Sequence, residues 1–224
     1  MRKLTFDWQY IVNVLPHYQT ALWITVKLAS IGILFAVLVG ITCSVIQYFK
    51  IKMLTKIVKV YLEIARNTPL LIQLFFLYYG LPKVGITLSE ELCGIIGLTF
   101  LGGGYMAEVF RAGFEAVSKS QIETGKAIGL SNLQLMRYVI IPQAFSYSVP
   151  GFGANCIFLI KETSIFSGIA ILELTNTTKN LMGIFYKTNE ALFMLVIGYL
   201  IILLPLILFL TWLERRVRHA EFGN

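Results

Sequence analysis

The sequence is dominated by long apolar stretches that contain few charged residues. A helix needs about 20 largely apolar residues to cross the hydrocarbon core of a bilayer. Five stretches meet this requirement, and the second is less apolar at its start; they cover about 22–46, 57–81, 92–114, 139–160 and 192–213. The sequence therefore predicts an all-α integral membrane protein with five transmembrane helices.

The composition supports a membrane protein. Only 14% of the 224 residues are charged and 57% are apolar, whereas soluble domains carry about 25% charged residues. The formal charge of +7 could indicate nucleic acid or an anionic membrane surface. The basic residues cluster between the apolar stretches, however, and no nucleic-acid-binding motif accompanies them. We expect the lipid bilayer as a partner and no nucleic acid.

The N-terminal segment 1–19 is predicted to lie outside the spans. Its apolar and aromatic residues before Pro16 have the pattern of an interfacial helix with anchors at headgroup level; they are Trp8, Tyr10, Ile11, Val14 and Leu15. No small-residue cleavage site follows the basic start, so we expect no removal. We predict an external segment 1–19, a transmembrane region 20–215 and a cytoplasmic tail 216–224.

The basic residues predict the orientation, because cytoplasmic loops carry more Lys and Arg than external ones. The richer side has Lys50, Lys52, Lys56, Lys59, Arg111, Lys119, Lys126, Arg137, Arg215, Arg216 and Arg218. The poorer side has Arg2, Lys3, Lys83, Lys161, Lys179 and Lys187. This predicts an external N-terminus and a cytoplasmic C-terminus.

The long cytoplasmic loop, about 115–142, reads as two short helices joined by a sharp turn. Gly129 suits the left-handed position that ends the first helix. Ser131 then caps the second, with Gln134 at the spacing of a capping box. Pro142 lacks a backbone donor and should bend the chain where the fourth span begins. Such a helix pair on the cytoplasmic face is predicted to be a docking element.

The spacing of this loop resembles the signature of bacterial ABC importer permeases, in which Glu-Ala-Ala precedes Gly and a later Ile-x-Leu-Pro. This chain has Glu123, Gly129 and Pro142 at those places. Thr124-Gly125 replaces the two alanines, and Gly125 should loosen the first short helix by about 1 kcal/mol relative to Ala.

Further segments resemble the polar amino-acid group of these permeases, which includes histidine, glutamine, arginine and cystine systems. They are residues 61–73, 104–113 and 159–165, with Glu173-Leu174 following. Four motifs in the right order cover most of the chain from about residue 20.

That resemblance implies the type I ABC importer permease fold in a bacterial inner membrane. The permease would pair with a second copy or a paralogue, and an external binding protein would deliver a polar amino acid. Two ATPase subunits would dock on the loop at Glu123, Ala127 and Gly129. The chain has no Gly-x-x-x-x-Gly-Lys-Ser/Thr phosphate loop. We therefore expect no cofactor in this chain, with ATP and Mg bound by the partner ATPase.

Charged residues inside spans are candidate substrate contacts, since each costs about 2.5–3.5 kcal/mol on insertion scales. Glu63 and Arg66 lie three apart in the second predicted span, shortly before Pro69, which frees a backbone carbonyl. They could contact substrate or form a local ion pair. Glu108 and Arg111 are better explained as a structural pair.

The polar run from Lys161 to Ser164 interrupts an apolar stretch and suggests a helix that ends near the pathway. An amino acid presents an ammonium and a carboxylate, so acidic groups and hydroxyls would complement it. We predict Glu63 and Glu162 as partners of the ammonium or a cationic side chain, with Thr163 and Ser164 as hydrogen-bonding groups. A plain external loop is the alternative.

No catalytic constellation and no metal site are predicted. Cys43, Cys93 and Cys156 lie in apolar stretches without paired or metal-like spacing, and Gly102–Gly104 is better explained by close helix packing than by phosphate binding. Alternating access driven by partner ATPases is the expected mechanism. The rivals are an ion-gradient-driven amino-acid transporter and a membrane-anchored structural or signalling component. The absence of visible internal repeats weakens the former.

Overall fold

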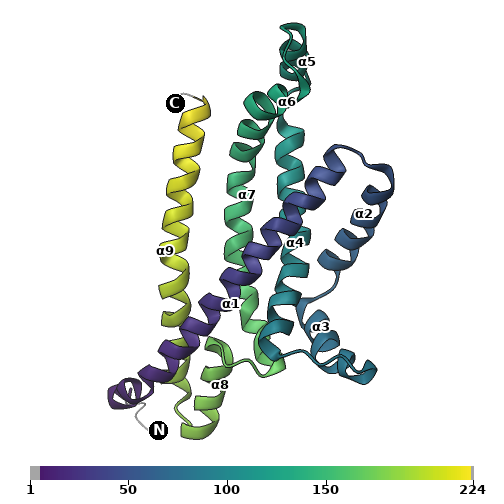
Figure 1. Cartoon of the computed structure of the whole chain (residues 1–224). Helices are drawn as coiled ribbons and strands as arrows, with labels where there is room; N and C mark the ends of the chain where they lie inside the picture. The colour runs from purple at the N-terminus through teal and green to yellow at the C-terminus, as the bar shows by residue number, and fades with distance from the viewer. Residues whose placement is uncertain (1–5, 223–224) are drawn as a thin grey trace. The chain divides into compact units, whose positions relative to one another are not determined.

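The computed structural model describes residues 6–222, and for residues 218–222 only the backbone. Arg2, Lys3 and the Arg218 side chain, which entered the orientation argument, lie outside this part. The described residues form helices and no strands (Figure 1). In chain order they are α1 Trp8–Tyr48, α2 Lys52–Asn67, α3 Leu70–Phe75, η1 Phe76–Gly80, η2 Leu81–Val84, α4 Glu90–Ala116, α5 Lys119–Ala127, α6 Asn132–Leu135, η3 Met136–Ile140, α7 Ile141–Glu162, η4 Thr163–Ile169, α8 Leu174–Phe185 and α9 Thr188–Phe222.

Three helices among the described residues are long and apolar enough to cross a membrane: α1, α4 and the part Thr188–Val217 of α9. The all-helical expectation is confirmed, whereas the expected count of five is not reproduced by this criterion. The other two predicted spans are helical as well. One is α7, which is less apolar, and the other is divided between α2 and the shorter apolar stretch Leu70–Val84.

The division of the second predicted span follows from a proline. Pro69 disfavours the helical conformation for the residue before it, and Thr68 is extended, with φ −109° and ψ 127°. α2 therefore ends at Asn67, and α3 begins after Pro69.

The predicted interfacial segment is the first part of α1, which does not end at Pro16. Proline in a helix interior removes a hydrogen bond and bends the helix. The helix stays continuous, and the Thr20 hydroxyl donates to the Pro16 carbonyl at 3.1 Å.

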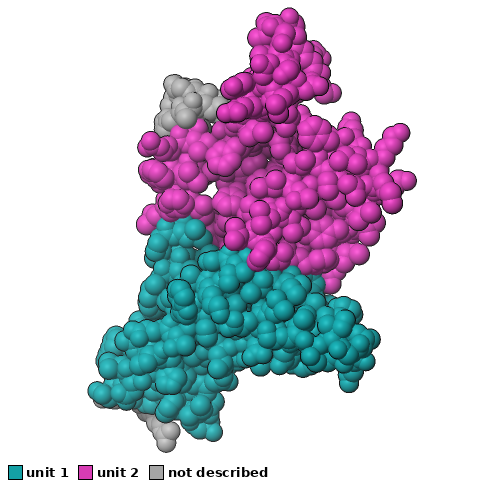
Figure 2. Space-filling model, in the orientation of Figure 1, with its two compact units in different colours: residues 1–32, 69–98, 158–206 teal, residues 33–68, 99–157, 207–224 magenta. Residues whose placement is uncertain are grey.

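The chain divides into two compact units, coloured separately in Figure 2. Unit 1 comprises residues 1–32, 69–98 and 158–206, and unit 2 comprises residues 33–68, 99–157 and 207–224. In unit 1 the start of α1 packs on α8 and the start of α9. The buried residues of this core are Tyr10, Val14, Tyr18, Ala21, Leu174, Leu181 and Met194.

In unit 2 the helices approach closely where glycines meet larger side chains. A Cβ on Gly103 would lie 2.5 Å from the Tyr61 hydroxyl oxygen, and one on Gly40 would lie 2.5 Å from the Met106 Cβ. Gly104 packs on Ala65 of α2. The packing role predicted for Gly102–Gly104 is thus confirmed at two of its three residues. The three cysteines are buried and free.

Candidate functional site

The predicted turn of the docking loop is present between α5 and α6, which follow α4 at one end of unit 2 (Figure 1). Gly129 has φ +88°. Its N–H donates to the Lys126 carbonyl at 3.0 Å, and the N–H of Leu130 donates to the Gly125 carbonyl at 3.0 Å. This pair of hydrogen bonds is the Schellman motif, which favours glycine at the left-handed position. The prediction for Gly129 is confirmed.

The second docking helix carries the predicted capping box. The N–H of Gln134 donates to the Ser131 hydroxyl at 3.3 Å, and the N–H of Ser131 donates to the Gln134 side-chain oxygen at 2.8 Å. After α6 the chain widens into a π-helical turn, η3, in which Ile141 N–H donates to the Met136 carbonyl. Pro142 follows and has no N–H to continue the α-helical pattern.

Gly125 is buried where α5 meets α6. A Cβ there would lie 2.5 Å from Leu135 Cδ2, so the glycine allows the two docking helices to approach. The loosening expected from its low helix propensity is thus accompanied by a tertiary contact that requires it. The candidate coupling residues Glu123, Ala127 and Gly129 are all exposed. Two large apolar side chains of the loop are also exposed, Ile128 (73%) and Leu133 (79%).

Arg66 forms its ion pair across two helices rather than along its own. Its guanidinium lies 3.3 Å from Glu108 of α4, so the local pair with Glu63 considered above is wrong. Glu63 instead accepts from the Asn67 side chain at 2.9 Å. The expected pair of Glu108 with Arg111 is confirmed at 2.7 Å, and Arg111 also contacts Glu115 at 2.7 Å. A chain of alternating charges therefore joins α2 to the end of α4.

A polar cavity of about 720 Å³ lies beside this charge chain in unit 2. The side chains around it carry both signs of charge and come from the end of α1, from α2 and from the end of α4. The lining residues are Gln47, Lys50, Thr55, Lys59, Leu62, Glu63, Arg66, Glu108, Arg111 and Glu115. Glu63 thus lies at a space that a small polar molecule could enter.

The other predicted substrate residues lie together in unit 1, where α7 ends at Glu162 and the tight helix η4 begins. Glu162 and Ser164 are half-buried. Thr163 is fully buried, and its hydroxyl donates to the Ile160 carbonyl at 2.7 Å. The predicted helix end is confirmed, but the Thr163 hydroxyl already has a partner in its own chain. Glu63 belongs to unit 2, so the predicted set is divided between the two units.

Glu173 is a fully buried carboxylate in the connection between α7 and α8. Its oxygens accept from the N–H groups of Thr175 and Asn176, each at 2.8 Å, and so cap α8. Burial raises the pKa of Glu173 to about 7, although these hydrogen bonds lower it. The N–H of Leu174 donates to the Thr25 hydroxyl of α1 at 3.2 Å.

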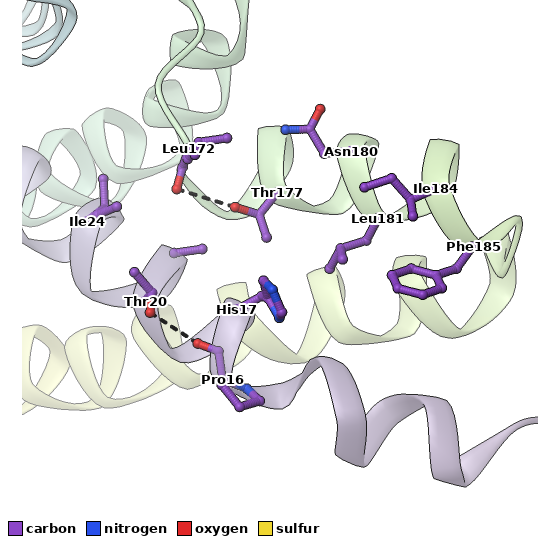
Figure 3. A pocket seen from close by; sticks show the side chains of 11 residues that line it. Pro16, His17, Thr20, Ile24, Leu172, Thr177, Asn180, Leu181, Ile184 and Phe185 are labelled. Atoms are coloured by element: carbon purple, nitrogen blue, oxygen red, sulfur yellow. Dashed lines mark hydrogen bonds between the residues drawn. The ribbon is translucent and has the colours of Figure 1, made fainter.

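Unit 1 also has a mainly apolar cavity of about 550 Å³ between α1 and α8 (Figure 3). His17 lies at its wall opposite Leu181, and Thr177 is turned toward the Leu172 carbonyl, to which it donates at 3.3 Å. No group of three His, Cys, Asp or Glu residues that could hold a metal occurs within the described residues.

Comparison with known proteins identifies the family. A family model described as "Binding-protein-dependent transport system inner membrane component" matches residues 32–219. The chain belongs to this family. It is 34% identical over 173 residues to the probable amino-acid permease protein YxeN of Bacillus subtilis (strain 168), covering 76% of this chain and 77% of that protein.

A second relative and a solved structure cover almost the whole chain. The probable amino-acid ABC transporter permease protein PatM of Vibrio harveyi is 30% identical over 218 residues, covering 96% of this chain and 98% of that protein. The crystal structure of an amino acid ABC transporter with histidines matches with a TM-score of 0.88 and 31% identity, over 95% of this chain and 100% of that chain. The resemblance to ABC importer permeases of the amino-acid group is confirmed.

The sequence did not predict several of the polar residues that line the cavity of unit 2. Lys50 and Lys59 were considered only as positive charges that predict the orientation. Gln47 was not considered. The partner of Arg66 was missed because spacing along one helix favours Glu63, whereas Glu108 lies on another helix. The amphipathic pattern of α2, with Lys59 and Glu63 one turn apart on its polar face, could have indicated that this part of the helix meets a polar space.

Proposed function

We propose that the chain is the permease subunit of an ABC importer that carries polar amino acids into the bacterial cell by alternating access. Partner ATPase subunits bind ATP and Mg and drive the change. This proposal rests mainly on the α5–α6 docking loop, whose turn at Gly129 and capping box at Ser131 hold the two short helices together. Membership of the binding-protein-dependent family supports an external binding protein as a further partner, and the amino-acid relatives support the substrate class.

In this proposal the loop transmits movement from the ATPase subunits to the spans. The exposed Glu123, Ala127 and Gly129 lie on the surface of a compact helix pair, which suits docking to a protein partner. Five segments span the inner membrane, with the N-terminus outside and the C-terminus in the cytoplasm. A second copy or a paralogue completes the pathway, because five helices are few to enclose one.

Glu63, Glu162, Thr163 and Ser164 are the proposed substrate contacts. Glu63 is exposed to a polar cavity, and Glu162 and Ser164 flank the point where α7 ends. The carboxylates would attract the ammonium or a cationic side chain of the amino acid. The weakest member is Thr163, whose hydroxyl is engaged with Ile160.

Reconstitution tests the function. The chain, its ATPase and its binding protein are placed in liposomes, and uptake of L-glutamine, L-histidine, L-arginine and L-cystine is measured with and without ATP. We expect ATP-dependent uptake of at least one amino acid and no uptake by the chain alone. Uptake by the chain alone on an ion gradient would instead identify a secondary transporter.

The substrate contacts are tested in the same liposomes. Replacement of both Glu63 and Glu162 by alanine should abolish uptake and the stimulation of ATP hydrolysis by substrate. Glu90→Ala, an exposed carboxylate at the start of α4, is the control and should keep both. Unchanged uptake in the double variant would overturn the site assignment while leaving the importer intact.

A further inference from the structure

We propose that the polar cavity of unit 2 is an exit subsite that holds the carboxylate of the transported amino acid on Lys50, Lys59 and Gln47. This rests on the proposed function and adds a specific binding site to it. None of these three residues belongs to the substrate contacts named above.

The charges around the cavity are unevenly paired. Arg66 and Arg111 are held by Glu108 and Glu115 in the charge chain. Lys50 and Lys59 line the same cavity, and neither has an ion pair or a side-chain hydrogen bond among the described residues. Two ammonium groups are therefore available to an anion that enters.

Gln47 adds a hydrogen-bond donor without a partner. It lines the cavity, and its buried Nε2 has no hydrogen-bond partner in the described structure. Leaving a buried donor unsatisfied is unfavourable, and native proteins rarely do so without a reason. A carboxylate in the cavity would pair with the ammonium groups, and a turn of the Gln47 side chain would let its amide donate to the same ligand.

The backbone at Lys50 points to the same role. Lys50 has φ +52°, and its N–H donates to the Gln47 carbonyl at 3.1 Å while Ile51 N–H donates to the Ile46 carbonyl at 3.3 Å. These two hydrogen bonds form a Schellman motif like the one at Gly129 in the docking loop. Glycine is the usual residue at the left-handed position of this motif. A lysine in this conformation is strained, and such strain concentrates at functional sites.

Glu63 determines which class of anionic ligand the cavity favours. Its exposed carboxylate lines the cavity together with the two lysines, so a ligand with both signs of charge is favoured. The ammonium of an amino acid could pair with Glu63 while its carboxylate meets the lysines, whereas Glu63 would repel a phosphate. The observations therefore favour a zwitterionic amino acid over an anionic lipid headgroup.

The position of the cavity suggests that it acts during release. Glu115 lines it and lies near the end of α4, three residues before Ser118, the N-cap of the first docking helix. Movement of the docking loop would therefore act on a wall of the cavity. We infer that the subsite holds the amino acid transiently on the docking-loop side of the pathway.

Lysine protection can test the subsite in the permease–ATPase complex in lipid nanodiscs, without binding protein or nucleotide. The rate of acetylation of each lysine by an amine-reactive ester is followed by mass spectrometry, with L-histidine, L-glutamine or L-arginine present. Lys52 and Lys56 of α2 do not line the cavity and serve as internal references. The carboxamide of each amino acid is the matched control, because it keeps the amine and lacks the carboxylate.

We expect at least one amino acid to slow acetylation of Lys50 and Lys59 by about threefold or more relative to the references, and its carboxamide to give no such protection. Gln47→Leu should reduce the protection by weakening amino-acid binding about tenfold, which corresponds to about 1.4 kcal/mol. The complex should stay folded, because this change removes an unsatisfied donor rather than a bond.

Equal protection of all four lysines, equal protection by the carboxamide, or no protection by any of the amino acids would overturn the subsite. Protection by vesicle-derived phosphatidylglycerol in place of amino acids would assign the cavity to a lipid headgroup and also overturn it. The liposome uptake assay tests the importer separately. A complex that transports an amino acid without this protection refutes the subsite and leaves the proposed function standing.

Discussion

Two carboxyl groups, one in each unit, lie in opposite surroundings. In unit 1, Glu173 has no exposed surface and accepts two backbone N–H groups at the start of α8. In unit 2, Glu63 is exposed, accepts from the Asn67 side chain, and shares a cavity with two lysines outside any ion pair of the described residues. The buried carboxyl group of Glu173 caps a helix of the fold, whereas an exposed carboxylate beside uncompensated cations is available to a ligand.

The largest expected effect is a loss of stability in unit 1 as the pH rises. The folded protein binds the Glu173 proton more tightly than the unfolded chain, since burial raises its pKa from 4.5 to about 7. The stability is thus fully present below about pH 4.5 and falls as the pH rises through 7. The full difference is about 3 kcal/mol.

Unfolding of the permease in nanodiscs at pH 5 and pH 8, for the wild type and Glu173→Gln, measures this effect. The variant keeps an oxygen that can accept the capping hydrogen bonds but has no titrating group, so its stability should change less with pH. An equal change in both proteins would mean that Glu173 is not the group responsible, and the contrast between the two carboxylates would lose its basis.

The next effect concerns the two glycines with positive φ among residues 6–222, one in each unit. Replacement of Gly129 or Gly85 by valine forces a β-branched residue into the left-handed region, at a cost of roughly 1–2 kcal/mol. Neither added Cβ would meet another atom within 4 Å, so the two changes impose similar strain. Only Gly129 joins the docking helices, so only Gly129→Val should uncouple ATP hydrolysis from uptake.

ATPase activity and uptake by the reconstituted complex separate these outcomes. We expect uptake per ATP hydrolysed to fall about tenfold for Gly129→Val, because the strain of roughly 1–2 kcal/mol falls on the turn of the docking loop, and to stay near the wild-type value for Gly85→Val. Loss of coupling in both variants would trace the effect to strain in general rather than to the docking loop.

Local signals made the docking loop predictable from sequence. Its turn and cap depend on hydrogen bonds to backbone groups only a few residues away, made at Gly129, Ser131 and Gln134. Such local interactions can be recognised from residue spacing. The end of α7 at Glu162 was predictable for a similar reason, because a run of polar residues interrupts an apolar stretch.

Contacts between distant segments were not predictable from the same signals. Arg66 and Glu108 lie on different helices, and nothing in their spacing favours this pair over Glu63. The buried Gly125 has low helix propensity, and only the packing of Leu135 explains its presence. The polar cavity is likewise lined by the end of α1, by α2 and by the end of α4. Because these segments are far apart in the sequence, the cavity could not be predicted without the fold.

A smaller effect should distinguish the two serine caps of the docking loop. Ser131 belongs to a reciprocal capping box, whereas Ser118 accepts one backbone N–H at 3.4 Å. Ser131→Ala should therefore cost about 1 kcal/mol, and Ser118→Ala less. Hydrogen exchange at the α5 and α6 amides measures both, and a larger effect of Ser118→Ala would contradict this ranking.

The smallest expected effect on stability is at Lys50, where ligand protection should decrease while the unfolding free energy hardly changes. Lys50→Gly relieves the strain of φ +52°, but glycine also gives the unfolded chain more freedom, by about 0.4–1 kcal/mol. The two terms nearly cancel, so the unfolding free energy should stay within about 0.5 kcal/mol of the wild type or rise slightly. Protection of Lys59 by amino acids should nevertheless decrease, because one of the two ammonium groups is gone. A clear loss of stability would mean that the lysine side chain supports the fold, and the unit 2 cavity would then resemble the structural surroundings of Glu173 at this helix end.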